Sequence, residues 1–364
     1  MLVLSQVPAT AGAPSPSLVV PMAMPDHPEI DRTPLDRDLD RDPALRAAFA
    51  IVYYNKQEFL QSLHKVIEQV SYNPAEELKI DESCASSTPF KSAIIGGMDD
   101  LLCQVDVASA ERADNGTSEV YFLADDAGQR KVVFKPAVDA ETERAAINEQ
   151  AAYLLDRGLA GVPKTALGSV KLGAENEETF GSAQAFVPGE DATDYGANVF
   201  AKDDVHRIGV LDARILNRDR HAGNLMMTQD KRLVPIDHAL SFPDVNGGEL
   251  ADVSSEVFFY PQAKEPFSEE LLAEIAAINV DEDLDLLQDA GVAEESQLGV
   301  WMSTVLLQKA AAKGKTLFEI GSMLVRPGDR TQPSVLETLS AEAMAQGTEQ
   351  FFEAFNNLVD AALV

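Results

Sequence analysis

The stretch from Val210 to Asp237, VLDARILNRDRHAGNLMMTQDKRLVPID, decides the fold of this chain. In it, Asp219 is followed five positions later by Asn224, and Asp237 comes after a further short segment. A carboxylate can position and deprotonate a hydroxyl, while an amide oxygen and a second carboxylate can hold magnesium against nucleotide phosphates. The order of these side chains is therefore typical of a phosphoryl-transfer site and predicts an ATP-dependent kinase.

A β-hairpin is expected inside this stretch. The apolar runs 225–227 and 233–236 flank Thr228-Gln229-Asp230-Lys231, a pattern typical of two strands joined by a turn. Such a hairpin would bring Asn224 and Asp237 back together, so that both could reach the same metal ions. The Asp-x4-Asn spacing alone is common by chance, and the prediction depends on the other half of the site.

The segment SEVYFLADDAGQRKVVFKP predicts a second hairpin, in which strand-forming residues lie on each side of 125–128. Its second strand places Val133 and Lys135 on one face. A lysine at the end of an apolar strand either extends to water or is held in a cleft. A turn of Gly116, Thr117 and Ser118 directly precedes this strand pair.

Residues 141–157, ETERAAINEQAAYLLDR, predict a helix with acidic residues in its first turn and Gly158 near its end. Glu149 lies in the middle of this helix. It could be an ordinary solvated charge, but Lys135 needs an acidic residue on a nearby helix to hold its ammonium toward phosphate. We therefore expect Glu149 to be the partner of Lys135.

The later elements give the fold class. A strand is expected at 165–172 and another over SAQAFVPG, with Gln184 to Val187 as a connector whose backbone groups could meet an adenine edge. Beyond Gly189 the pattern is helical, apart from the hairpin before Asp237. Strands with one helix followed mostly by helices predict a two-lobed α+β fold.

The third quarter and the end of the chain carry helix-capping patterns. Ser268 can cap a helix, and Thr316 with Glu319 and Ser334 with Glu337 form capping-box patterns. Trp301 lies in an apolar stripe and is expected to be core. The acidic residues between these apolar positions are expected on solvated faces.

Four segments are expected along the chain. Residues 1–45 have the composition of a mobile extension, and 46–109 that of a bracing helix near 47–70 followed by a linker. The strand-rich lobe would comprise residues 110–188, and the helical lobe 189–364.

Bulk composition restricts the partners. The net charge of −31 should repel nucleic acids and weighs mildly against spontaneous adsorption to anionic membranes. The two cysteines, Cys84 and Cys103, define neither a disulfide framework nor a zinc site, which favours a reducing compartment. No apolar run is long enough to span a bilayer. We expect a cytoplasmic protein with at most peripheral membrane contact.

Several segments resemble one known family. DRHAGNLMM and VPIDHALSFP are similar to the catalytic and metal-binding segments of the phosphatidylinositol 3-/4-kinase superfamily, where Asp-Arg-His replaces the His-Arg-Asp order of ordinary protein kinases. GTSEVYFLADDAGQRKVVFKPA and NEQAAYLLDRGLAGVPKT resemble the phosphate loop, lysine strand and central helix of its plant gamma-type phosphatidylinositol 4-kinases. FFYPQAKEPFSEELLAEI and TLFEIGSMLVR are similar to their C-terminal lobe, so the resemblance covers about residues 110–345.

The resemblance implies a two-lobed protein-kinase-like fold of the atypical phosphoinositide-kinase type, which uses ATP with Mg²⁺ or Mn²⁺. It implies that Lys135 contacts the nucleotide phosphates with Glu149 as its partner, and that Asp219 is the catalytic base. Asn224 and Asp237 would be metal ligands, with Arg220 and His221 supporting the catalytic loop. The phosphate loop and nucleotide pocket would comprise Gly116, Thr117, Ser118, Val133, Gln184, Phe186, Val187, Met226 and Ile236.

Two features separate this chain from the family pattern. The metal motif reads Asp237-His238-Ala239, where glycine commonly takes the third position, and alanine would strain the loop if that residue needed a positive φ. The segment after Asp237 carries one lysine, Lys264, and several acids, with 257–260 apolar. The family resemblance favours a phosphoinositide lipid as the acceptor, whereas the charge of this segment does not and makes a protein hydroxyl nearly as plausible. An inactive nucleotide-binding scaffold is the third alternative.

Overall fold

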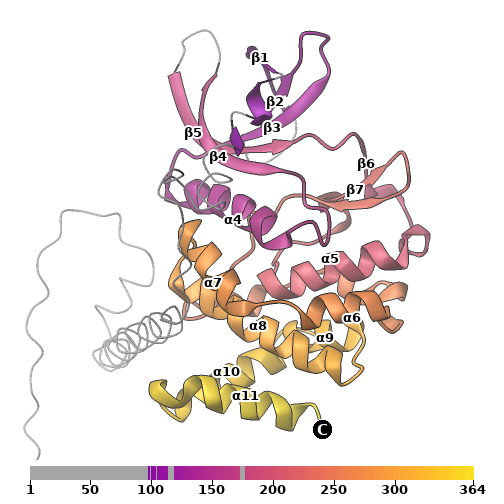
Figure 1. The fold of residues 1–364 in the computed structure, drawn as a ribbon, viewed down its shortest axis with the longest axis vertical. Helices are drawn as coiled ribbons and strands as arrows, with labels where there is room; N and C mark the ends of the chain where they lie inside the picture. Colours follow the sequence, from indigo (N-terminus) through magenta and orange to yellow (C-terminus); the bar gives the residue numbers. More distant parts are fainter. Residues whose placement is uncertain (1–96, 99, 104, 114–118, 173–176) are drawn as a thin grey trace, which may run out of the picture. The chain divides into compact units, whose positions relative to one another are not determined.

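The computed structural model describes residues 97–98, 100–103, 105–113, 119–172 and 177–364, all within the second of two compact units, 55–364. The extension expected at 1–45 and the helix expected at 47–70 lie outside these residues. So do Gly116, Thr117 and Ser118. The described part of the second unit has a strand-rich lobe and a helical lobe (Figure 1), as the order of sequence patterns predicted.

The strand-rich lobe is a five-stranded antiparallel sheet in the order β1-β2-β3-β5-β4. Its strands are β1 (Asp106–Arg112), β2 (Tyr121–Ala124), β3 (Arg130–Pro136), β4 (Thr165–Leu172) and β5 (Glu177–Ala185). The predicted hairpin that carries Lys135 is formed by β2 and β3. Gly128 in its turn has a φ of 76°, which glycine adopts without strain. Buried Leu123, Val132 and Phe134 form part of the core of this lobe.

In the sequence, helix α4 (Ala140–Asp156) comes after β3 and before β4. Among the described residues it is the one long helix that interrupts the strands of this sheet. Asp139 caps it through a capping box with Thr142, a feature that the first-turn acids did not identify. At its other end Arg157 has a φ of 47° and Gly158 a φ of 84°, so two left-handed residues end the helix. Figure 1 shows α4 beneath the sheet, next to the helical lobe.

The chain enters the helical lobe through a small sheet. The strand predicted over SAQAFVPG ends earlier than expected, at Ala185, so Gln184 lies in β5 and Phe186 and Val187 lie in the connector. The segment after Gly189 was expected to be helical apart from one hairpin. Instead, β6 (Gly189–Asp191) pairs with the hairpin of β7 (Leu225–Thr228) and β8 (Leu233–Pro235) to give a three-stranded antiparallel sheet.

Helix α5 (Lys202–Ile215) leads into the loop that carries Asp219, and it packs against α8 (Glu294–Ala312) and α9 (Leu317–Leu324). The remaining helices are α6 (Glu269–Ala276), α7 (Val280–Asp289), α10 (Val335–Ala345) and α11 (Phe351–Ala362). Ser268 caps α6, and the predicted capping boxes begin α9 and α10. The main core lies among these helices.

Trp301, which was expected to be core, is partly buried and packs against this core. Its ring lies 4.7 Å from that of Phe352 and 5.5 Å from that of Phe355, both in α11. These aromatic contacts fasten the last helix to α8. Because Gly209 of α5 faces Leu317 so closely that a Cβ would lie 2.3 Å from Leu317 Cδ2, α5 and α9 also pack tightly.

Candidate active site

The ammonium of Lys135 joins the two lobes. Its Nζ donates to Glu149 Oε1 of α4 at 2.5 Å and to Asp237 Oδ1 of the helical lobe at 2.9 Å. The Lys135 side chain is 24% exposed and that of Glu149 is 2% exposed, whereas Asp237 is 42% exposed. The lysine is thus held between two carboxylates and does not extend freely to water, and Glu149 is its partner rather than a solvated helix charge.

Both members of this pair are held in their charged forms. Burial by itself would lower the pKa of Lys135, but the charges of Glu149 and Asp237 outweigh it, so that its pKa is raised. Burial would likewise raise the pKa of Glu149, but Lys135 and a contact with His238 outweigh it and lower its pKa. An ammonium held between two carboxylates can present its charge to an anionic ligand at the cleft.

The loop after α5 brings three predicted residues together. Asn224 donates from Nδ2 to the Asp219 carbonyl oxygen at 2.9 Å and lies 3.4 Å from Asp219 Oδ2. The Ile236 N–H donates to the Asn224 carbonyl oxygen at 3.0 Å, which places Asp237 next to Asn224. The hairpin predicted between them is therefore present and has the expected effect. The side chain of Asp219 is about half exposed to solvent.

Arg220 supports this loop from inside the protein. Its side chain is fully buried, and its Nη1 donates to the carbonyl oxygens of Asn224 and Ile236, both at 2.6 Å. Its Nε lies 3.2 Å from both carboxylate oxygens of Asp212. Ser255 also donates to that carboxylate, at 2.9 Å. Because Arg220 is buried behind the loop, its place agrees with the supporting role predicted for it and not with direct contact to a substrate.

His221 lies at the surface of the same loop. Its Nδ1 accepts from the Gly223 N–H at 3.0 Å, and its Nε2 lies 3.8 Å from Asp219 Oδ2. The ring is about half exposed. It caps the 3-10 turn that ends at Asn224 and lies within reach of a ligand at Asp219.

The metal-motif loop contains a left-handed residue at an unexpected position. Asp237 has a φ of 56°, whereas Ala239 is not among the residues of positive φ. Alanine in place of the usual glycine therefore does not strain this loop. A non-glycine residue in the left-handed region costs free energy that the surroundings must offset, and the Lys135 contact is one such interaction.

Two side chains of α4 hold the segment after Asp237. Asn148 donates to the carbonyl oxygens of Ala239 at 2.8 Å and Ser241 at 2.9 Å. Glu149 accepts from the backbone N–H of His238 at 3.1 Å. Sequence reasoning missed Asn148 and Asp212, because a polar residue on an amphipathic helix has the same pattern whether it faces solvent or a loop.

The residues expected around an adenine ring lie where the lobes meet. Val133 shares the face of β3 that carries Lys135 and pairs with Gln184 on β5. Gln184 is buried and donates to Thr165 Oγ1 at 2.9 Å. Phe186 donates its backbone N–H to the Lys131 carbonyl oxygen, and its ring packs against Phe122. The partly exposed members of this set are Val133, Phe186, Val187, Met226 and Ile236.

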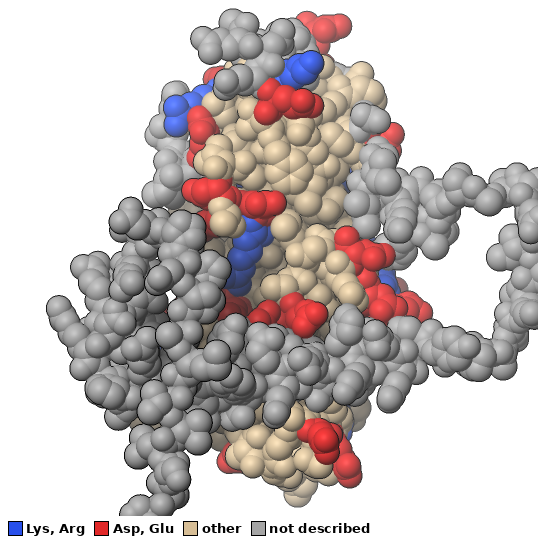
Figure 2. Space-filling model, turned by 90° about the vertical axis from the view of Figure 1, so that its left-hand side faces the viewer, with Lys and Arg blue, Asp and Glu red and all other residues tan. Residues whose placement is uncertain are grey.

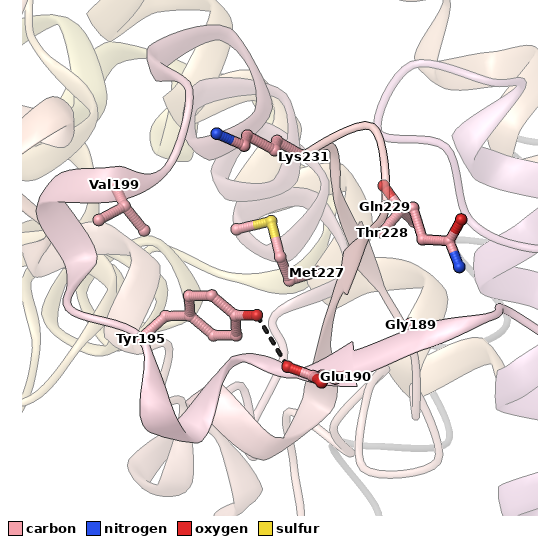
Figure 3. A pocket seen from close by; sticks show the side chains of 8 residues that line it. All are labelled: Gly189, Glu190, Tyr195, Val199, Met227, Thr228, Gln229 and Lys231. Carbon is pink, nitrogen blue, oxygen red and sulfur yellow. Dashed lines mark hydrogen bonds between the residues drawn. The ribbon is translucent and has the colours of Figure 1, made fainter.

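A separate cavity of about 650 Å³ lies beside the small sheet (Figure 3). Tyr195 donates to Glu190 Oε2 at 2.9 Å on one side of it, and Lys231 lies on another side. Lys135, Asp219, Asn224 and Asp237 are not among its lining residues. The cavity is therefore distinct from the cluster around Lys135.

Most of the apolar run 257–260, in the segment after Asp237, is buried or partly buried. Val257 and Phe258 are buried in the core, and only Phe259 of the described apolar run is strongly exposed, at 47%. Lys264, the one lysine of residues 241–264, has its Nζ 5.2 Å from the centre of the Phe318 ring. Figure 2 shows one face of the molecule, where acidic groups flank a narrow strip of basic ones. No helix among the described residues is both long and apolar enough to cross a membrane.

Residues 140–320 match the family described as phosphatidylinositol 3- and 4-kinase. This segment contains α4, the catalytic stretch and the loop after Asp237. Residues 140–320 belong to that family. The matched segment includes Glu149, Asp219, Asn224 and Asp237.

The relatives are plant proteins. The chain is 33% identical over 290 residues to phosphatidylinositol 4-kinase gamma 3 of Arabidopsis thaliana, covering 64% of this chain and 50% of the relative. It is 32% identical over 291 residues to phosphatidylinositol 4-kinase gamma 4 of rice, Oryza sativa subsp. japonica, covering 67% and 51%. To phosphatidylinositol 4-kinase gamma 5 of Arabidopsis thaliana it is 39% identical over 227 residues, covering 54% and 35%. The chain thus spans about half the length, or less, of these curated relatives.

A solved structure with some likeness is the PknI kinase domain of Mycobacterium tuberculosis, at 16% identity and a TM-score of 0.29, covering 71% of this chain and 96% of that domain.

Proposed function

We propose that this kinase-family chain transfers the γ-phosphate of ATP to a hydroxyl of phosphatidylinositol. The observation that carries the proposal is the position of Lys135, whose ammonium contacts Glu149 in one lobe and Asp237 in the other. This contact requires that the two lobes be closed on each other around the residues that phosphoryl transfer needs. The names of the plant relatives point to the 4-hydroxyl of the inositol ring.

The residues at the cleft fit a magnesium nucleotide. No group of three or more His, Cys, Asp or Glu side chains with metal-binding geometry occurs among the described residues. This agrees with Mg²⁺, which is usually held by one or two protein groups while phosphate oxygens and water supply the rest. Asn224 donates through Nδ2, which leaves Oδ1 for a metal, and Asp237 has Oδ2 available because Oδ1 accepts from Lys135. When bound, the metal would neutralise charge that develops on the transferred phosphoryl group.

The protein groups would then act as follows. Lys135 would contact the phosphates, held in place by Glu149. Asp219 would accept the proton of the acceptor hydroxyl, since its carboxylate is about half exposed and Asn224 Nδ2 lies 3.4 Å from its Oδ2. Arg220 would keep the catalytic loop and the metal loop in register through its two carbonyl contacts. Val133, Gln184, Phe186, Val187, Met226 and Ile236 would line the nucleotide base.

One observation favours a second acceptor. Residues 241–264, in the segment after Asp237, carry Asp244, Glu249, Asp252 and Glu256 against Lys264, and this charge suits a basic protein segment better than an anionic bilayer. A protein hydroxyl is therefore the alternative acceptor, within the same chemistry and the same catalytic residues.

The test supplies ATP labelled in its γ-phosphate to the full chain. Phosphatidylinositol vesicles and a mixture of soluble proteins are offered in parallel, with the Asp219→Ala variant as the control. Label in lipid that depends on Asp219 supports the proposal, and chromatography of the product identifies the hydroxyl. Label in protein alone supports the alternative acceptor. Absence of label in both, in the presence of Mg²⁺ or Mn²⁺, would leave only a nucleotide-binding scaffold and overturn the proposal.

A further inference from the structure

Glu249 lies at a junction of three parts of the candidate active site. Its carboxylate accepts from Arg144 Nη1 at 3.0 Å and from Arg144 Nη2 at 2.6 Å. The backbone N–H of Asp244 donates to Glu249 Oε2 at 2.7 Å, and Arg218 Nη2 lies 3.6 Å from the same oxygen. A single carboxylate thus holds an arginine of α4, an arginine of the catalytic loop and the backbone of the loop after Asp237.

Both arginines that contact Glu249 lie close in sequence to residues of the candidate active site. Arg144 lies on α4 five positions before Glu149, and it also donates to the carbonyl oxygen of Phe242 at 3.1 Å. Arg218 directly precedes Asp219, and its backbone N–H donates to the Leu240 carbonyl oxygen. The position of α4, which sets where Glu149 meets Lys135, is therefore tied to the loop that carries Asp219.

The charge of Glu249 matters for this junction. Arg144 and Arg218 bring two positive charges close together, and without an anion between them they would repel each other across the α4–loop contact. The bidentate geometry with Arg144 is also the stronger form of an arginine–carboxylate contact. The Glu249 side chain is 26% exposed, so the contact is only partly screened by water.

In many kinases a phosphorylated residue of the loop performs such a task, by pairing with arginines and so ordering the loop and positioning the helix. Here the hydroxyl side chains between His238 and Ser255 are Ser241, Ser254 and Ser255. Ser241 and Ser255 are buried, and Ser254 is partly buried with its N–H bonded to the Asn217 carbonyl oxygen. The loop thus offers no freely exposed hydroxyl for a phosphate, whereas Glu249 supplies a permanent negative charge.

We propose that Glu249 is a positioning residue that holds α4 and the catalytic loop in their working arrangement without phosphorylation of the loop. The proposal rests on the proposed phosphotransferase function for its effect on rate, but its effect on α4 can be measured without any activity. It makes Glu249, Arg144 and Arg218 one unit, although none of them touches the reacting groups.

The test uses the full chain and four variants. Glu249→Gln removes the charge with little change of shape, Arg144→Ala removes the partner, and the double variant combines them. Glu337→Gln is the matched control, because Glu337 also binds an arginine, Arg326, through both carboxylate oxygens and also accepts from a backbone N–H, that of Ser334. Phosphate on residues 238–255 of the wild type is checked by mass spectrometry.

Hydrogen exchange of residues 140–156 is the first measurement. We expect residues 140–156 to exchange faster in Glu249→Gln than in the wild type or in Glu337→Gln. In wild type that carries no phosphate on the loop, we expect these residues to be fully protected. Equal protection of this helix in Glu249→Gln and Glu337→Gln would overturn the proposal. So would a wild-type helix that is protected only when the loop is phosphorylated.

The rate of phosphate transfer is the second measurement. We expect kcat to fall about tenfold in Glu249→Gln, an effect of the size expected for one charged hydrogen-bonding contact. The double variant should lose less rate than the product of the two single losses, because both changes break the Arg144–Glu249 contact. Independent, multiplying losses would contradict the proposal. If the wild type itself transferred no phosphate, the proposed function would fail, while the exchange experiment would still decide the role of Glu249.

Discussion

Lys135 Nζ lies 2.5 Å from Glu149 Oε1. This contact joins strand β3, which ends at Pro136, to helix α4, which begins at Ala140. Because Glu149 is almost fully buried, an unpaired carboxylate there would be costly, and the pair is therefore maintained as a unit. The same ammonium also donates to Asp237 of the helical lobe at 2.9 Å, so it links β3 and α4 to that lobe.

Glu149→Gln should lower phosphate transfer by about 10- to 100-fold, since Lys135 would lose its buried anionic partner and its position at the cleft. Initial rates over a range of ATP concentrations measure this effect. Glu143→Gln is the control, because Glu143 is exposed on the same helix. Equal rates for the two variants would show that the Lys135–Glu149 contact has no role in the reaction.

Asp219→Ala should reduce phosphate transfer by about 10²- to 10⁴-fold, the usual contribution of a positioned general base. The fold should persist, because the side chain is about half exposed. Circular dichroism and thermal unfolding test the fold, and labelled ATP tests transfer. Asp126→Ala, at an exposed position in the β2–β3 turn, is the matched control. Transfer at the wild-type rate in Asp219→Ala would remove Asp219 from the mechanism.

The features that sequence predicted are those with a local pattern. Both hairpins, the strand at 165–172 and the capping boxes of α9 and α10 depend on residues close together in the chain, and the structure contains them. The β6 strand was missed because it has three residues, all exposed, and exists only by pairing with β7. Its formation depends on contacts that no local pattern encodes.

The supporting residues of the site were harder to predict. Asp212, Asp283 and Glu249 have the spacing of solvated acids on helices or loops, yet each binds an arginine from another element. Periodicity assigns a residue to a face, but it does not tell which face meets a neighbouring element. Arg214, Arg218 and Arg220 lie close together in the sequence, and a buried arginine needs an acidic partner. This cluster of arginines could have predicted that some acidic residues elsewhere in the chain are buried partners.

Asp283→Asn should lower the free energy of unfolding by about 3–5 kcal/mol, the usual effect of removing one partner of a buried ion pair. Asp283 Oδ2 accepts from Arg214 Nη2 at 2.5 Å, and both side chains are almost fully buried. Burial raises the pKa of Asp283 and lowers that of Arg214, so each depends on the other's charge to stay ionised. Chemical denaturation measures the change. Asp285→Asn, on an exposed position of the same helix, should change stability little.

His206→Gln should change how stability depends on pH. His206 is buried on α5, its Nε2 lies 2.7 Å from the Gln262 carbonyl oxygen, and its ring packs against Phe267. Burial lowers the pKa of His206 below its ordinary value of 6.5, with the charge of Lys202 in the same direction and those of Glu265 and Asp203 against it. The folded state therefore keeps this ring neutral at a pH where the unfolded chain already binds a proton.

The sign of the effect follows from proton binding. Below about pH 6.5 the unfolded chain takes up a proton at His206 that the folded chain does not, so the free energy of unfolding falls as the pH falls. The loss should amount to roughly 1 kcal/mol per pH unit until the folded-state pKa is reached. The carboxylates with lowered pKa, Glu149 and Glu249, lose their contribution at lower pH, below about their ordinary value of 4.5. Denaturation of wild type and His206→Gln at pH 7.5 and 5.5 separates the two effects. The wild type should lose more stability than the variant over this interval, and parallel losses would mean that His206 is not held neutral by the fold.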